Sequence, residues 1–167
     1  MSSRTSPPPR LFATCLAGVA TIAALSAAGW MGWQTHALDV QRQHSADYAA
    51  AARQSAMNLM SIDYATADQS VRRVLDGSTG TFRKNFAGTA DDFVKALQAE
   101  KVVTTATIND VAVESLSSGS AVVLVSANSH RVSTDTSTNP QQTRTWRMVL
   151  TMQETNSGIK MSAVEFV

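Results

Sequence analysis

The hydrophobic pattern of the chain changes twice along its length. Residues Leu11–Trp33 contain no charged side chain, residues 46–101 place apolar positions at helical spacing, and the residues after Lys101 alternate between apolar and polar. At about 1.5 Å per residue, the first run makes a helix of roughly 34 Å, enough to cross a hydrocarbon core of about 30 Å. The pattern predicts a membrane-spanning helix, then further helices, then strands.

The residues that flank the apolar run favour a retained anchor over a cleaved signal peptide. Arg4 and Arg10 precede the run, and Trp30 and Trp33 lie where the aromatic belt of a membrane interface would be. A basic start and small residues near Ala27 also fit a signal peptide. A signal core, however, usually ends after about 7–15 residues, and this run is longer.

The domain organisation follows from this anchor. We predict a cytoplasmic tail over residues 1–10, a transmembrane helix over 11–33, a helical stalk over 34–45 and an extracytoplasmic domain over 46–167. Basic residues near a membrane span stay on the cytoplasmic side, and no acidic residue precedes Asp39. The chain is therefore expected to cross the plasma membrane once, with its C-terminal domain outside.

Helices are expected in the first half of the domain. The alanine-rich segment from Ala46 forms the first, because alanine is the best helix former and the apolar residues share one side. A second helix is expected from a cap at Asp68 to a stop at Gly77. A tight connection over residues 80–88 then leads to a third helix, capped by Thr89.

Four strands are expected after Lys101: Val102–Leu116, Ser120–Val132, Thr143–Glu154 and Ile159–Val167. Ser117-Ser118-Gly119 and Asn156-Ser157-Gly158 have hairpin-turn composition, and residues 133–142 form the longest loop. Trp146, Met148, Leu150 and Met152 share one face of their strand. Helices followed by an antiparallel meander predict an α+β fold, with a curved four-stranded sheet wrapped around the long first helix.

Charge and cysteine content exclude several functions. The part after the apolar run holds 12 basic and 13 acidic residues, so it lacks the basic footprint that nucleic acid or an anionic lipid surface requires. Cys15, the single cysteine, lies inside the apolar run. The domain therefore has no disulfide, thiolate nucleophile or cysteine-based metal site. Cys15 is interpreted as a small packing residue, with acylation as the alternative.

No catalytic constellation is found, so no catalytic, cofactor-binding or metal-ligating residue is assigned. His36 and His44 fall on the stalk and His130 in a strand, at spacings that match no familiar metal pattern. Asp63 and Tyr64 could perform acid–base chemistry if both faced a cavity. We favour the simpler interpretation, in which Tyr64 packs in the core and Asp63 caps or pairs nearby. Arg147 is expected on the solvent side of its strand, with contact to a partner as the alternative.

Several segments of the chain form a recognisable set with the N-terminal anchor and the alanine-rich helix. They are Ile62-Asp63-Tyr64, Val74-Leu75-Asp76-Gly77-Ser78-Thr79-Gly80-Thr81-Phe82, Ala121–Val125, Thr145-Trp146-Arg147-Met148-Val149-Leu150 and Val164-Glu165-Phe166-Val167. Over nearly the whole chain, this set resembles the Mce-associated membrane proteins, a family that accompanies the mammalian-cell-entry lipid importers of actinobacteria. The chain departs from the family at Ile159-Lys160-Met161, where a tryptophan is often found.

The resemblance implies a cone-shaped domain similar to nuclear-transport-factor-2-like folds and to VirB-type assembly subunits. It also implies a non-enzymatic accessory subunit, without a cofactor, that assembles or stabilises an Mce-type importer and has transporter subunits or related membrane proteins as partners. Two alternatives stay open. One is a small-molecule-binding or enzymatic cavity near Tyr64, and the other is a scaffold of a different secretion or division complex.

The predicted topology can be tested by proteolysis. Protease added to intact spheroplasts should digest the C-terminal domain, because the anchor places it outside the plasma membrane. Immunoblotting against a C-terminal tag measures the digestion, and a cytoplasmic protein that stays intact is the control. Full protection of the domain in intact spheroplasts would contradict the topology.

Overall fold

The computed structural model of the chain describes residues 41–133 and 142–167. Residues 1–40 lie outside this description. They include the predicted tail, the transmembrane helix 11–33 with Cys15, and the part of the stalk that carries His36. Most of the predicted loop 133–142 also lies outside it. Within the described residues, no helix is long and apolar enough to cross a membrane.

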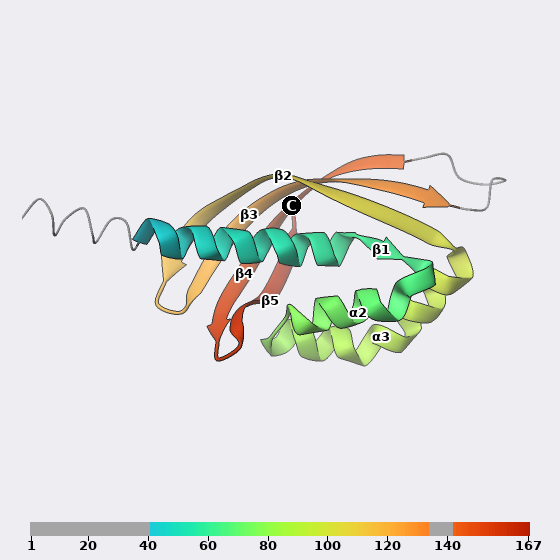
Figure 1. The fold of residues 1–167 in the computed structure, drawn as a ribbon, viewed down its shortest axis with the longest axis horizontal. Coiled ribbons are helices and arrows are strands. Elements are labelled where there is room, and N and C mark those ends of the chain that lie inside the picture. The colour runs from blue at the N-terminus through green and yellow to red at the C-terminus, as the bar shows by residue number, and fades with distance from the viewer. Residues whose placement is uncertain (1–40, 134–141) are drawn as a thin grey trace, which may run out of the picture. The chain divides into compact units, whose positions relative to one another are not determined.

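The described chain begins with a helix over residues 41–60, here called the central helix. The elements that follow are β1 (Ile62–Asp63), the short 3₁₀ helix η1 (Tyr64–Thr66), α2 (Ala67–Asp76), α3 (Gly80–Glu100), β2 (Val102–Ser117), β3 (Ser120–Ser133), β4 (Gln142–Thr155) and β5 (Gly158–Phe166). The strands form one antiparallel sheet in the order β1-β2-β3-β4-β5. The sheet is curved and the central helix crosses one of its faces (Figure 1). The predicted α+β class is confirmed.

The core lies between the central helix and the sheet. The helix contributes residues spaced four apart, so that they form one stripe, namely Tyr48, Ala52, Ala56 and Met60. The sheet contributes alternate positions of its strands, including Val123, Val125 and Ala127 of β3 and Met148, Leu150 and Met152 of β4. We call this the inner face of the sheet and the opposite one the outer face. The predicted shared face of β4 is confirmed.

The sheet has five strands, so the prediction of four was wrong. The additional strand is β1, in which Ile62 pairs with Thr104 and Asp63 with Val103. Two residues are too few to produce an alternating pattern, and the pairing exists only because the end of the central helix is brought to the edge of β2. The four predicted strands agree with β2 to β5 within one residue at every end.

The third helix is longer than predicted. It starts at Gly80, where a connection over residues 80–88 was expected. Phe82 and Phe86 are four residues apart and their rings stack at 5.9 Å between centroids, while Phe86 meets Phe93 edge-on at the same distance. This spacing is helical, and it outweighs the glycines that suggested a turn. The second helix begins one residue before Asp68, which lies in its first turn, and ends at Gly77 as predicted.

The residues between α2 and α3 attach these helices to the free edge of β5. Thr79 N–H donates to the carbonyl oxygen of Met161 at 2.8 Å, and Met161 N–H donates to the carbonyl oxygen of Gly77 at 2.9 Å. Ser78 is buried between them, and its hydroxyl donates to the carbonyl oxygen of Leu75 at 3.0 Å. We call residues Gly77–Thr79 the edge clamp. The clamp satisfies backbone groups that an edge strand would otherwise expose.

Two glycines of α3 should respond oppositely to alanine. Gly80 has φ of 59°, a left-handed conformation that costs a side chain roughly 1 kcal/mol. Gly88 does not have the left-handed conformation, and a Cβ added there would meet nothing within 4 Å. Gly80→Ala should therefore lower the free energy of unfolding by about 1 kcal/mol, and Gly88→Ala should raise it by about 0.5–1 kcal/mol. Urea denaturation followed by circular dichroism measures both, and equal signs would contradict the assigned conformations.

Tyr48 should make the domain sensitive to alkaline pH. Its hydroxyl is buried with no hydrogen-bond partner among the described residues. Burial, with the Glu154 carboxylate as a second cause, raises the pKa of this phenol. The folded state therefore favours the protonated phenol, and this stabilisation is present below the unfolded tyrosine pKa of about 10 and lost as pH rises through the folded value. Tyr48→Phe should reduce the loss of stability above pH of about 10 and add about 1 kcal/mol at neutral pH.

Tyr64→Phe is the matched control, because Tyr64 is the only other tyrosine and lies half-buried on η1. Thermal unfolding of the wild type and the two variants between neutral and alkaline pH measures the effect. If Tyr48→Phe loses as much stability at alkaline pH as Tyr64→Phe does, the assignment of the effect to Tyr48 is contradicted.

Candidate functional site

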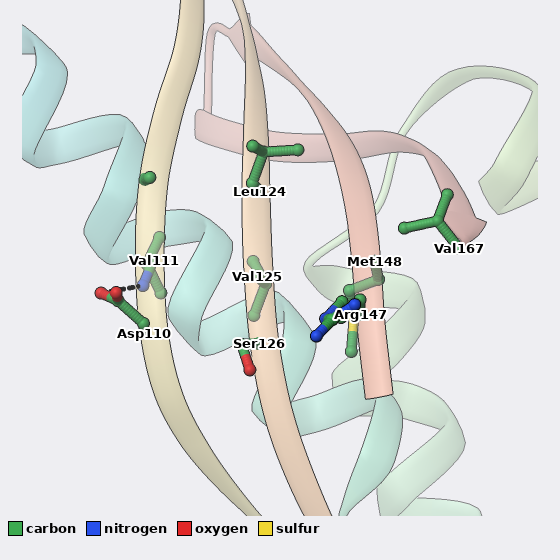
Figure 2. Close-up of a pocket in the computed structure, with 9 residues that line it drawn as sticks. Asp110, Val111, Leu124, Val125, Ser126, Arg147, Met148 and Val167 are labelled. Carbon is green, nitrogen blue, oxygen red and sulfur yellow. Dashed lines mark hydrogen bonds between the residues drawn. The ribbon is translucent and has the colours of Figure 1, made fainter. Parts of the chain in front are cut away.

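An apolar groove lies on the outer face of the sheet, across β2, β3 and β4. Its volume is about 290 Å³. Figure 2 shows the residues that line it, which are Asp110, Val111, Ala112, Leu124, Val125, Ser126, Arg147, Met148 and Val167. The central helix lies behind these strands in that view, so the groove opens on the side away from the core.

The register of the sheet builds the groove from two cross-strand rows. One row joins Ala112 and Leu124 of the lining with Val149, which lies outside it. The next joins Asp110, Ser126 and Arg147. Residues directly opposite each other in an antiparallel pair share a face, so the first row is apolar and the second carries opposite charges at its two ends.

Local backbone features fix the two ends of the groove. At the β2 end, the register shifts between Ile108 and Asp110, which marks a bulge. Asp110 Oδ1 accepts a hydrogen bond from Val111 N–H at 2.8 Å, which holds the carboxylate beside the strand (Figure 2). At the β4 end, Val167 N–H donates to the carbonyl oxygen of Arg147 at 3.0 Å, which places the Val167 side chain beside the groove.

The groove exposes apolar surface. Leu124 is 41% exposed and Val167 is 71% exposed, although both are aliphatic. Burying such a side chain is worth about 1.5–3 kcal/mol, so a partner that covers this face gains binding free energy. Asp110 and Arg147 lie on different strands at its sides and can select the charge of what binds. The arrangement suits docking of an apolar side chain.

The structure separates Asp63 and Tyr64 from this groove. Asp63 Oδ1 accepts a hydrogen bond from Ala65 N–H at 2.8 Å and is the N-cap of η1. The capping role that we favoured is therefore confirmed. Tyr64 is half-buried rather than fully buried, and it does not line the groove.

The two described histidines make separate local contacts. The His44 ring lies 5.2 Å from the Tyr48 ring, and His130 Nδ1 lies 3.2 Å from Thr143 Oγ1. Among the described residues, no group of three or more His, Cys, Asp or Glu side chains could hold a metal ion. Arg147 is exposed, as predicted, and belongs to the groove.

Sequence reasoning missed Leu124 and Val167 as groove residues. The signal that could have found Leu124 is the run Ala121–Val125, in which apolar residues occupy both faces of a strand whose outer side should be polar. Nothing in the local pattern indicates Val167, because its position beside β4 depends on the pairing of Met148 with Phe166.

The fold resembles that of VirB8-type domains. The VirB8 protein of Agrobacterium tumefaciens is 13% identical with a TM-score of 0.57, over 75% of this chain and 92% of that chain. An IcmL-like type IV secretion system protein from Legionella pneumophila is 13% identical with a TM-score of 0.58, over 73% and 91%. The periplasmic domain of DotI is 14% identical with a TM-score of 0.59, over 71% and 91%. The expected likeness to VirB-type domains is confirmed for the fold.

The chain belongs to the family of Rv1363c/MT1408-like proteins, whose pattern matches residues 10–167. Uncharacterized protein Rv1363c of Mycobacterium tuberculosis (strain ATCC 25618 / H37Rv) is 44% identical over 139 residues. The alignment covers 83% of this chain and 52% of that protein. The chain thus spans about half the length of this relative.

Proposed function

We propose that this chain is a non-enzymatic accessory subunit that binds other proteins of a cell-envelope complex through the outer face of its sheet. The observation that carries the proposal is the apolar groove with Leu124 and Val167 exposed beside it. The inner face of the same strands is covered by the central helix, so the outer face is where a sheet of this kind offers apolar area to another protein.

The finer form of the proposal is that the complex is an Mce-type lipid importer and that the domain lies outside the plasma membrane. The family resemblance of the sequence supports the importer, and the apolar run Leu11–Trp33 supports membrane attachment. The periplasmic location of the DotI domain, which has the same fold, supports the extracytoplasmic placement.

A different secretion machine is the second candidate complex. It is favoured by the likeness to a type IV secretion system protein, which rests on fold and not on sequence identity. The two complexes differ in the proteins that should copurify, while the docking surface on this chain is the same in both.

Substitution of Leu124 tests the proposed surface. Leu124→Gln replaces an apolar side chain in the groove and should reduce recovery of partner subunits by at least about tenfold, as loss of a well-packed anchor does. Val132→Gln is the matched control, because Val132 lies on the same strand and face, outside the groove, and is similarly exposed at 38% against 41% for Leu124. Tagged full-length chains are purified from gently solubilised membranes, and quantitative mass spectrometry measures the partners.

The outcomes distinguish docking at the groove from the identity of the complex. Equal recovery of partners by both variants would contradict docking at the groove. Recovery of secretion or division proteins in place of importer subunits would contradict the importer while leaving the surface intact. Importer subunits recovered by the wild type and by Val132→Gln, but depleted with Leu124→Gln, are the expected result.

A further inference from the structure

A second pocket lies on the inner face of the sheet and is separate from the groove. It has a volume of about 300 Å³ and is lined by Thr104, Ser129, Arg131, Arg144 and Trp146. We call it the arginine pocket. Register places Thr104 opposite Arg131 and Ser129 opposite Arg144, so three strands bring these side chains to one place.

The arginine pocket has more hydrogen-bond donors than acceptors to receive them. Trp146 Nε1–H donates to Ser129 Oγ at 2.8 Å, which leaves the Ser129 hydroxyl hydrogen to be donated elsewhere. Arg131 Nε is buried and has no hydrogen-bond partner among the described residues. Arg144 is exposed and makes no hydrogen bond or ion pair with another described residue. A buried guanidinium N–H without an acceptor, beside a second guanidinium that is open to solvent, favours an anionic ligand.

The charge of the pocket favours a ligand with one negative charge. Arg131 Nη2 forms an ion pair with Glu100 Oε2 at 2.9 Å, and the Glu100 side chain is 65% exposed. This carboxylate offsets one of the two guanidinium groups, so the local balance is a single positive charge. A monoanion neutralises the net charge of these three residues, whereas a phosphate dianion would leave the site with a net negative charge.

An aromatic wall completes the site. The Trp146 ring lines the pocket and meets the Phe166 ring edge-on at 5.6 Å, and Phe166 is 52% exposed. A ligand held by its acidic group can therefore bury an apolar or aromatic part against Trp146. We infer that the arginine pocket binds a small carboxylate with an attached apolar group, the carboxylate facing Arg144 and Arg131. This inference is independent of partner docking at the groove.

Binding of benzoate to the full-length chain tests the inference, because benzoate combines one carboxylate with one ring. The readout is the indole N–H resonance of Trp146, assigned by comparison with Trp146→Phe, since the chain has three tryptophans. Benzoate should shift this resonance in a saturable way, and the neutral isostere benzamide should not. Arg144→Gln should weaken binding by about tenfold or more, as loss of a charge-assisted hydrogen bond does.

Two further variants test whether the effect is specific to the pocket and whether benzoate affinity can also be increased. Arg72→Gln makes the same charge change at an exposed position of α2, outside the pocket, and should leave benzoate binding unchanged. Glu100→Gln frees Arg131 from its ion pair and should strengthen binding several-fold. Benzamide binding as tightly as benzoate, or wild-type affinity in Arg144→Gln, would overturn the inference. Tighter binding of phenyl phosphate than of benzoate would reassign the site to phosphate and overturn it equally.

Discussion

The close packing of the central helix on the sheet is the constraint on which the other features of the domain depend. Ala52 and Ala56 are fully buried at the contact, and their small side chains let the helix axis come near the strands. The same core contains the long, flexible side chains of Met148 and Met152 of β4, which can fill irregular space. A larger residue at Ala52 or Ala56 would separate the layers, and the strands would lose the surface around which they curve.

The two edges of the sheet are closed by different devices, and both depend on this packing. Along β2, side chains from the central helix and from the residue after it bind the backbone of the strand. Ala106 N–H donates to Ser61 Oγ, and Arg53 Nη1 donates to the carbonyl oxygen of Ile108, each at 3.2 Å. Along β5, the edge clamp makes the contacts through its own backbone. Both devices blunt edges that would otherwise pair with other chains. Gly77, Ser78 and Thr79 thus have a structural role in closing this edge.

The sequence predicts the fold better than it predicts the sites, for a physical reason. Hairpin turns such as Asn156-Ser157-Gly158 and the alternation around Leu150 are local, so β2 to β5 follow from neighbouring residues. β1 is not predicted because its pairing depends on where the central helix ends. The start of α3 differs from the prediction because the contact of Phe82 with Phe86 at helical spacing outweighs the turn propensity of the glycines. The groove and the arginine pocket need the register between strands, since the pairing of Ser129 with Arg144 is visible only once the sheet is formed.

The segment from β1 to the edge clamp has a mechanical consequence. It pairs with β2 at one edge of the sheet and with β5 at the other, and most of it is the helix α2. The rise per residue of an α-helix is fixed by its hydrogen bonds, so α2 links the two edges through an element of defined length. The groove and the arginine pocket lie on opposite faces of the same three strands. A change in the curvature of those strands would therefore alter both sites at once.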